Sequence, residues 1–440
     1  MKRSMLLQSC ATAALLALAL PTGAQLRLPQ VPQVPQVPLP NLPAVRDLNE
    51  SAQQRVRESL APRELAGRRA QTIRELLQRH GDALEADPGG APAVRGEVVA
   101  LSPSAAALEA ARAEGFAVAR EEALEGLDER AVVLRAPAGM TATQALQRLR
   151  AIDPHGTYDF NHLYLGGGAP PGAAAAAPAP PDAPAQAQRP KLGLIDGGVD
   201  VRHPALRHAE VRSFGCGGQR VPSPHGTAVA SLLVGRARGF AGAAPGAALY
   251  AADVYCGEPT GGAAAQLLAA FAWLARERVP VINVSLVGPP NAALERVIKS
   301  LAARGHLIVA AVGNDGPAAP PLYPAAYPEV IAVTGVDAHD RALPEAGRGP
   351  HVAFAAPGAD MLVAASGSDD LAPARGTSYA APLVAGLLAI AGSSGAEAVA
   401  LLKRDAIDLG PPGRDPIYGY GLVGRALRVD PIALRNSRAR

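Results

Sequence analysis

A serine, a histidine and an aspartate of this 440-residue chain lie in short segments whose composition suits nucleophilic catalysis. Ser378 follows Gly376 and Thr377 at the start of an apolar, alanine-rich stretch. We expect a helix to begin there, because Ser378 would then lie where unpaired N–H groups and the positive end of the helix dipole favour a developing oxyanion. Taken alone, Ser378 could also be an ordinary serine near the start of a buried helix.

Asp196 and His225 supply the other two groups. Asp196 ends the apolar run KLGLID, which predicts a buried parallel strand leading into a glycine turn. An acid at the carboxyl end of such a strand lies where ligands gather in open α/β sheets. His225 precedes Gly226 and a run of small residues that would let a helix pack closely. Each residue also has a possible structural role, because Asp196 could form an Asp-Gly turn and His225 could cap a helix.

Asp196, His225 and Ser378 follow one another in one of the three known chain orders of a Ser-His-Asp triad. The chain resembles the subtilisin-like serine peptidases (subtilases), whose three signatures match DGGVD, HGTAVAS and GTSYAAP. The resemblance covers about residues 190–428. It implies a three-layer α/β domain with a mainly parallel sheet, and a serine endopeptidase that cleaves protein or peptide substrates through an acyl-enzyme.

The resemblance also assigns residues around the triad. Asn314, in GHLIVAAVGNDG, matches the asparagine that forms the oxyanion hole with the backbone N–H of Ser378, although ordinary turn chemistry is the alternative. An extended substrate would lie along a short segment by strand pairing. The residues that match this segment and the neighbouring turn are Ser285, Leu286, Val287, Gly288 and Gly313.

Two bulky residues depart from the family pattern near the pocket for the P1 side chain. Val287 stands where a small residue is usual, and Leu322 aligns near the base of the pocket, so we expect small or medium apolar P1 residues. No acidic residue of the matched pocket segments is expected to pair with an Arg or Lys side chain of a substrate at P1, so a trypsin-like preference is not expected. The segment GRARGFAGAAPGAALYAADVY lacks the asparagine- and carbonyl-rich loop of the strong calcium site of many relatives, so no cofactor or metal is expected, with a weak calcium site left open.

The first 24 residues have the pattern of a secretory signal peptide. Lys2 and Arg3 precede the apolar run ATAALLALAL, which is too short to span a membrane, and small residues follow it. We therefore expect export to the periplasm or the medium. Cys216 and Cys256 remain after signal removal, and an even count in an oxidising compartment favours a disulfide over two buried thiols.

The chain between the signal and the triad divides into three parts. Residues 25–94 form a proline-rich and then charged, helical segment of unassigned role. Residues 95–165 read as β-α-β-β-α-β, a small ferredoxin-like α+β unit that resembles the inhibitor-type propeptide of many subtilases, with an unrelated accessory domain as the alternative. Residues 166–190 are an Ala/Pro/Gly linker, residues 191–428 the catalytic domain, and residues 429–440 a basic tail.

Composition narrows the function classes. The formal net charge of +3 is too small to indicate a nucleic-acid partner, and no later segment looks transmembrane. We expect a monomer whose own prodomain is its intramolecular inhibitor. Two alternatives to a general serine endopeptidase made as a zymogen stay open: a catalytically silent subtilase-like binding protein, and a dedicated processing protease with few targets.

Overall fold

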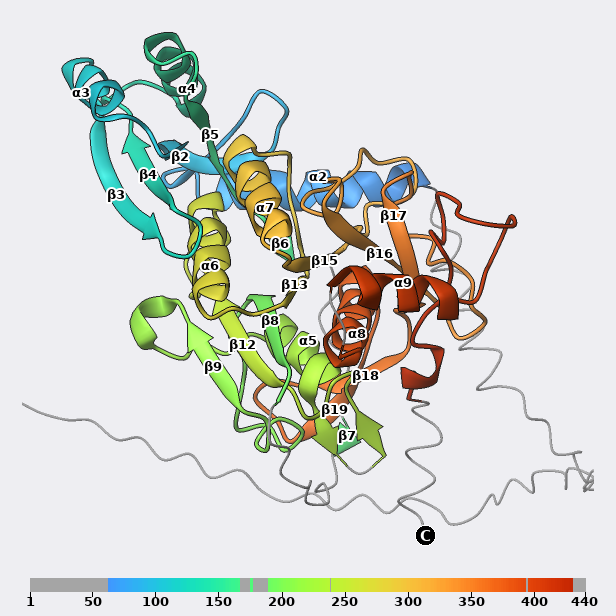
Figure 1. Ribbon diagram of the computed structural model, residues 1–440. Coiled ribbons are helices and arrows are strands. Elements are labelled where there is room, and N and C mark those ends of the chain that lie inside the picture. The colour runs from blue at the N-terminus through green and yellow to red at the C-terminus, as the bar shows by residue number, and fades with distance from the viewer. Residues whose placement is uncertain (1–61, 167–174, 177–188, 238, 393–394, 430–440) are drawn as a thin grey trace, which may run out of the picture. The chain divides into compact units, whose positions relative to one another are not determined.

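The computed structural model describes residues 62–166, 175–176, 189–237, 239–392 and 395–429. The expected signal peptide, the proline-rich segment, most of the linker and nearly all of the basic tail lie outside the described residues. The described part contains a large parallel sheet and a small antiparallel sheet, each with its own helices (Figure 1). We call residues 189–429 the large-sheet region and residues 84–162 the small-sheet region.

The large-sheet region is built on seven strands, and every pairing between them is parallel. Their order is β17-β16-β15-β13-β8-β12-β9. The bounds are β8 Lys191–Asp196, β9 Val211–Phe214, β12 Ala248–Asp253, β13 Val281–Val284, β15 Leu307–Ala311, β16 Val330–Val336 and β17 Val352–Pro357. Central strands such as β8 and β13 are buried on both faces, which explains their nearly continuous apolar sequences.

Helices cover both faces of this sheet and complete three layers, as the sequence predicts (Figure 1). Helices α6 Ala264–Arg276 and α7 Ala292–Ala303 pack on one face in one apolar cluster. Helices α5 Pro224–Val234 and α8 Thr377–Ile390 pack on the other face in a second cluster, and α9 Gly395–Asp405 follows α8. Alanine lines much of both clusters, so the backbones of helix and sheet lie close together.

The small-sheet region has the β-α-β-β-α-β order that the sequence predicts. The elements are β2 Pro92–Leu101, α3 Ala105–Ala113, β3 Ala117–Leu124, β4 Glu129–Arg135, α4 Ala142–Ile152 and β5 Thr157–His162. Both helices pack on one face of the sheet, and its other face packs against α6 and α7. The sheet begins earlier than residue 95, because β1 Leu84–Ala86 pairs antiparallel with β2.

Short elements surround these two sheets. Helix α2 Pro62–Arg79 lies before β1 and packs Leu76 and Leu77 against an apolar cluster that includes Leu163 and Ala263. The short pairs are β10 Arg236–Ala237 with β11 Phe240–Ala241, β14 Leu286–Val287 with β6 Leu165–Gly166, and β18 Met361–Ala364 with β19 Asp370–Ala374 and β7 Ala175–Ala176. Single 3-10 turns span Cys216–Gly218 and Arg425–Leu427.

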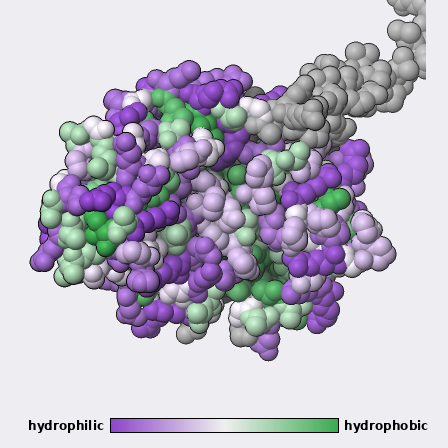
Figure 2. Space-filling view, turned by 90° about the horizontal axis from the view of Figure 1, so that it is seen from above, coloured by the Kyte–Doolittle hydropathy of each residue, from purple (hydrophilic) through white to green (hydrophobic). Residues whose placement is uncertain are grey.

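The described surface is mixed in character. In Figure 2, hydrophilic residues surround small, separate apolar patches. Among the described residues the large apolar side chains that are exposed are Ile390 and Ile407. No single described helix meets the length and hydropathy needed to cross a membrane, and α8 with α9, bent by 119°, meets them only as a pair.

Candidate active site

The three residues of the predicted triad meet at the carboxyl ends of the parallel strands. Nδ1 of His225 lies 2.9 Å from both carboxylate oxygens of Asp196, and Nε2 lies 3.1 Å from Oγ of Ser378. Asp196 and Ser378 are buried, and the His225 side chain is only 17% exposed. This is the geometry in which an imidazole takes the proton of a hydroxyl nucleophile while a carboxylate fixes its tautomer.

Local sequence explains where His225 lies. Ser223 caps helix α5 by accepting a hydrogen bond from the N–H of Gly226, and Pro224 takes the first helical position, where its missing N–H costs least. His225 therefore enters the first turn of α5 and points back toward the end of β8. The 2.6 Å hydrogen bond from the N–H of Gly197 to Oδ1 of Asp196 holds the carboxylate in place.

Ser378 is the second residue of helix α8, as its sequence context predicts. Gly376 precedes the helix with φ of 142°, a conformation that favours glycine. Arg375 binds Glu345 with two hydrogen bonds of 2.7 and 3.0 Å, so a partly buried ion pair holds the turn that leads into α8. The hydroxyl of Ser285 donates to the carbonyl of Ser378 at 3.0 Å and fixes the first turn itself.

The electrostatic setting of His225 favours its protonated form. Burial of the ring lowers the pKa of His225, but the charge and the hydrogen bond of Asp196 raise it by more. The net pKa of His225 therefore lies above its ordinary value. A base of raised pKa binds the transferred proton more strongly once Ser378 attacks. The ring must be neutral beforehand, so the site is ready only above that pKa.

Asn314 lies beside the start of α8, next to Ser378. Its side-chain Oδ1 accepts the N–H of Thr377 at 3.0 Å, which fixes the orientation of the amide beside the start of α8. Its Nδ2 is buried and has no hydrogen-bond partner. A buried N–H group without a partner is costly in a resting protein, and it suits an oxygen that becomes negative during reaction.

A stretch of the chain itself, strand β6, occupies the segment that is predicted to bind substrate. Strand β6 pairs antiparallel with β14, with Leu165 opposite Val287 and Gly166 opposite Leu286. A side chain at Gly166 would contact His225 at 3.9 Å. The residues just before β6 are buried as well, because Tyr164 donates from its hydroxyl to the carbonyl of Pro289 at 2.8 Å and its own carbonyl accepts the hydroxyl of Tyr255.

Val287 and Leu322 converge on Gly313. A Cβ built on Gly313 would lie 2.5 Å from Cδ1 of Leu322 and 3.6 Å from Cγ1 of Val287. An acidic residue next to these residues pairs with an arginine of the chain itself. Oδ2 of Asp315 lies 3.3 Å from Nε of Arg69, and both side chains are largely buried, with Asp315 15% and Arg69 16% exposed.

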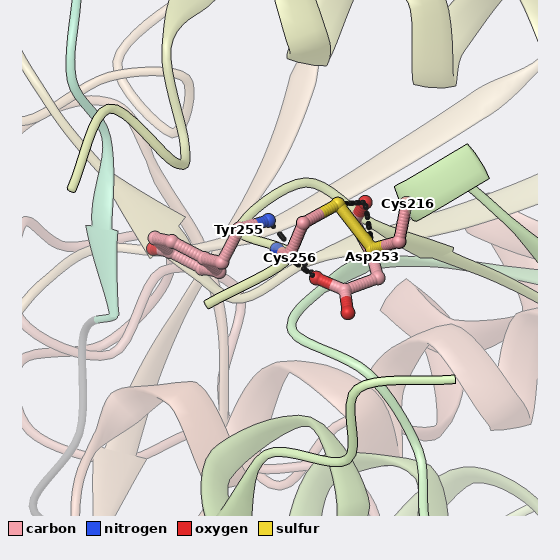
Figure 3. The surroundings of a disulfide bond; sticks show 4 residues. All are labelled: Cys216, Asp253, Tyr255 and Cys256. Atoms are coloured by element: carbon pink, nitrogen blue, oxygen red, sulfur yellow. Dashed lines mark hydrogen bonds between the residues drawn. A yellow bond between two sulfur atoms is a disulfide. The ribbon is translucent and has the colours of Figure 1, made fainter. Parts of the chain in front are cut away.

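Cys216 and Cys256 form a disulfide beside the cleft, with Cα atoms 5.1 Å apart (Figure 3). Oδ1 of Asp253 accepts the N–H groups of Tyr255 and Cys256, and Tyr255 points away from the sulfur atoms. Among the described residues, the grouped metal-ligand types are Cys216, Asp253 and Cys256, whose sulfur atoms are already bonded to each other. Residues 236–252 contain no Asp, Glu, Asn or Gln, so a hard cation would find no side-chain oxygen ligands of the usual kind there.

Several site residues escape sequence reasoning. Arg69 and Tyr255 enter the cleft from segments far apart in the chain, and no local pattern marks them. Asp315 could have been noticed, since it directly follows Asn314 and is charged in an otherwise apolar and small-residue segment. His203 and His306 lie apart from the triad and hydrogen-bond the backbone carbonyls of Asp370 and Val279.

Fold and site together define an α/β protein with a serine, histidine and aspartate at the carboxyl ends of parallel strands. The model of the subtilase family matches residues 187–421, more than half of the chain. The chain belongs to the subtilase family.

Curated relatives share about a third of the aligned residues. Subtilisin E of Bacillus subtilis (strain 168) is 32% identical over 187 residues, 39% of this chain and 47% of that protein. The minor extracellular protease Epr of the same strain is 30% identical over 207 residues, 45% of this chain and 32% of that protein. This chain thus spans about a third to a half of the length of these relatives. Subtilisin BL of Lederbergia lenta is 33% identical over 243 residues and is covered to 88%.

A solved structure agrees with the fold. Fervidolysin from Fervidobacterium pennivorans, described as a keratinolytic enzyme related to subtilisin, superposes with a TM-score of 0.62 over 78% of this chain and 62% of its own. The sequence identity is 19%, so this similarity concerns the fold alone.

Proposed function

We propose that this protein is an exported serine endopeptidase made as a zymogen. The observation that carries the proposal is His225, which bridges Asp196 and Ser378 within hydrogen-bonding distance of both. Ser378 attacks a peptide carbonyl as His225 takes its proton, and the peptide C–N bond breaks as His225 returns that proton to the leaving amine. Water then attacks the acyl-enzyme through the same base, which frees the acid product and regenerates Ser378.

The small-sheet region is the inhibitory propeptide in this proposal. Its last strand, β5, continues into residues 163–166, of which Leu165 and Gly166 pair with the β14 edge that a substrate needs. The N–H of Tyr164 donates to the carbonyl of Gly262 at 2.8 Å, so the segment is bound from the other side of the cleft as well. A substrate cannot pair with β14 while β6 does.

The register of β6 indicates where the chain cuts itself. Strand β6 runs from the position opposite Val287 to the position opposite Leu286, toward Ser285, whose hydroxyl binds the carbonyl of Ser378. In an antiparallel pair the next residue of a bound peptide would face Ser285. We therefore propose cleavage after Gly167, so that the catalytic fragment starts at Gly168. A glycine at P1 suits a pocket that Val287 and Leu322 narrow.

The test is expression of the full chain and of Ser378→Ala in a host without other subtilases. The native protein should be labelled by a fluorophosphonate and should yield a fragment that begins at Gly168, as read by mass spectrometry. Ser378→Ala should accumulate as the signal-cleaved precursor and remain unlabelled. Equal processing of both proteins would refute self-maturation, and absence of labelling with an intact fold would favour the silent binding protein.

A further inference from the structure

Arg69 of helix α2 reaches into the cleft, although α2 precedes both sheets in the chain. Its guanidinium makes two polar contacts, with Nη2 donating to the carbonyl of Val287 at 3.2 Å and Nε lying 3.3 Å from Oδ2 of Asp315. Arg69 is 16% exposed, so most of this long charged side chain is removed from water. A contact of this kind is not an incidental surface ion pair, because burying both charges requires that each has a partner.

The two partners of Arg69 belong to the substrate edge and the oxyanion turn. Val287 pairs with Leu165 of β6, and Asp315 directly follows Asn314. The guanidinium therefore lies beside the positions that the residues before the scissile bond would take. Its neighbour Arg68 is exposed, so one of two adjacent arginines is committed to the cleft and the other is not.

Asp315 has a reason to bind a cation. Burial raises the pKa of Asp315 above its ordinary value, and the charge of Arg69 offsets only part of that rise. Among the described residues, Arg69 is its ion-pair partner. When the N-terminal part of the chain departs, this carboxylate stays in the wall of the cleft with the Val287 carbonyl beside it. A carboxylate and a carbonyl at this spacing accept the N–H groups of a guanidinium, whose donors lie in one plane.

We propose that Asp315 and the Val287 carbonyl form a guanidinium-binding subsite of the cleft, which Arg69 fills in the precursor and a basic substrate side chain fills in the processed protein. The subsite selects peptides with Arg at one of the three residues before the scissile bond. Helix α2 is thereby a second inhibitory element, separate from residues 163–166. This inference rests on the proposed peptidase function.

The first arm of the test needs no catalysis. In the full chain carrying Ser378→Ala, Arg69→Ala removes the guanidinium and leaves its place beside Asp315. Methylguanidinium at tens of millimolar should raise the melting temperature of this variant more than methylurea does at equal ionic strength. Adding Asp315→Asn should abolish the difference, while Arg68→Ala in place of Arg69→Ala should never show it. An equal response with Asp315 and with Asn at this position would overturn the subsite.

The second arm uses the processed protein and peptides that differ only by Arg or citrulline, its neutral analogue, at each of the three positions. We expect kcat/KM to favour Arg about tenfold at one position, and Asp315→Asn to remove the preference while citrulline peptides are cleaved as before. Asp405→Asn, an exposed ion-pair acid on α9, is the control. If fluorophosphonate labels the protein but Asp315→Asn keeps the Arg preference, the subsite is refuted and the peptidase stands. If nothing labels the protein, the peptidase fails, and the first arm alone decides the subsite.

Discussion

Besides the sheet face that packs on α6 and α7, the small-sheet region and the segment after it contact the large-sheet region in two places that differ in character. The β3–β4 turn meets these helices through ion pairs whose arginine side chains are exposed, whereas residues 163–166 enter the cleft. The ion pairs are Arg276 with Glu125, Arg296 with Glu129, and Arg304 with Asp128. We call these six residues the docking pairs. Exposed ion pairs contribute little each and weaken in salt, while buried hydrogen-bonded groups are costly to lose.

In the proposed zymogen, this contrast would make the propeptide both specific and removable. The docking pairs would orient the small-sheet region at little cost to its release, and the cleft segment would fix the chain in register until cleavage breaks its covalent link to the catalytic domain. Four predictions test whether the cleft and the docking pairs differ in this way.

The largest effect is expected in the cleft, at the oxyanion donor. Asn314→Ala removes the buried, unpartnered Nδ2 and should lower kcat about a hundredfold to a thousandfold with little change in KM, a range known for an oxyanion donor of a subtilisin. Steady-state kinetics on a peptide substrate, normalised to fluorophosphonate-labelled sites, measure it. A rise in KM at unchanged kcat would instead place Asn314 in substrate binding.

The next effect concerns the side chain that anchors the cleft segment. Tyr164→Ala removes a fully buried ring and should speed release of the cleaved propeptide by on the order of a hundredfold, because large-to-small changes at such sites cost several kcal/mol. Tyr164→Phe keeps the ring, loses the hydrogen bond to Pro289, and should change release by about tenfold at most. Size-exclusion chromatography of processed protein over time gives the rates. Equal rates for both variants would show that the ring does not anchor the segment.

A change of pH should alter the activity of the triad and leave the docking pairs unchanged. Since Asp196 raises the pKa of His225, kcat/KM should increase about tenfold per pH unit up to a midpoint above the ordinary histidine value of about 6.5, then level off. Asp196→Asn removes the cause and should move the midpoint of the residual activity to lower pH. The measurement is a pH–rate profile at constant ionic strength. A native midpoint at or below 6.5 would contradict the assigned environment of His225.

The smallest effect is expected at the docking pairs. Arg276→Ala should speed propeptide release only a few-fold, and the difference from the native protein should vanish in about 1 M salt, because both side chains of its pair with Glu125 are exposed. Release kinetics at low and high salt measure this. Arg207→Ala, on an exposed part of the large-sheet region, is the control. An effect of Arg276→Ala as large as that of Tyr164→Ala would contradict the distinction between the two contacts.

Sequence patterns predict those structural features that neighbouring residues in the chain determine. The apolar run ending at Asp196, the Ser223 and Pro224 start of α5, and the small-residue turn before Ser378 each carry their own structural signal, and the structure has all three. The element order of the small-sheet region is predictable for the same reason, since alternating and helical periodicities are properties of short windows.

Contacts between distant segments carry no such signal. Arg69 and Val287 are 218 residues apart, and one arginine in a charged helix looks like its neighbours in sequence. The early start of the small sheet at β1 is a related case, because three residues that pair only with β2 show too little periodicity to be recognised. Tertiary packing, rather than propensity, decides both.

The linker is paired on both sides of the proposed scissile bond. Strand β6 ends at Gly166 on β14, and β7 begins at Ala175 on β19, so eight residues connect two fixed points that both belong to one chain. The bond and Ser378 are then presented to each other at an effective concentration that does not depend on how many molecules share the solution. The first cut should follow first-order kinetics with a half-time unchanged by dilution, whereas later cuts in other chains should slow in proportion to it.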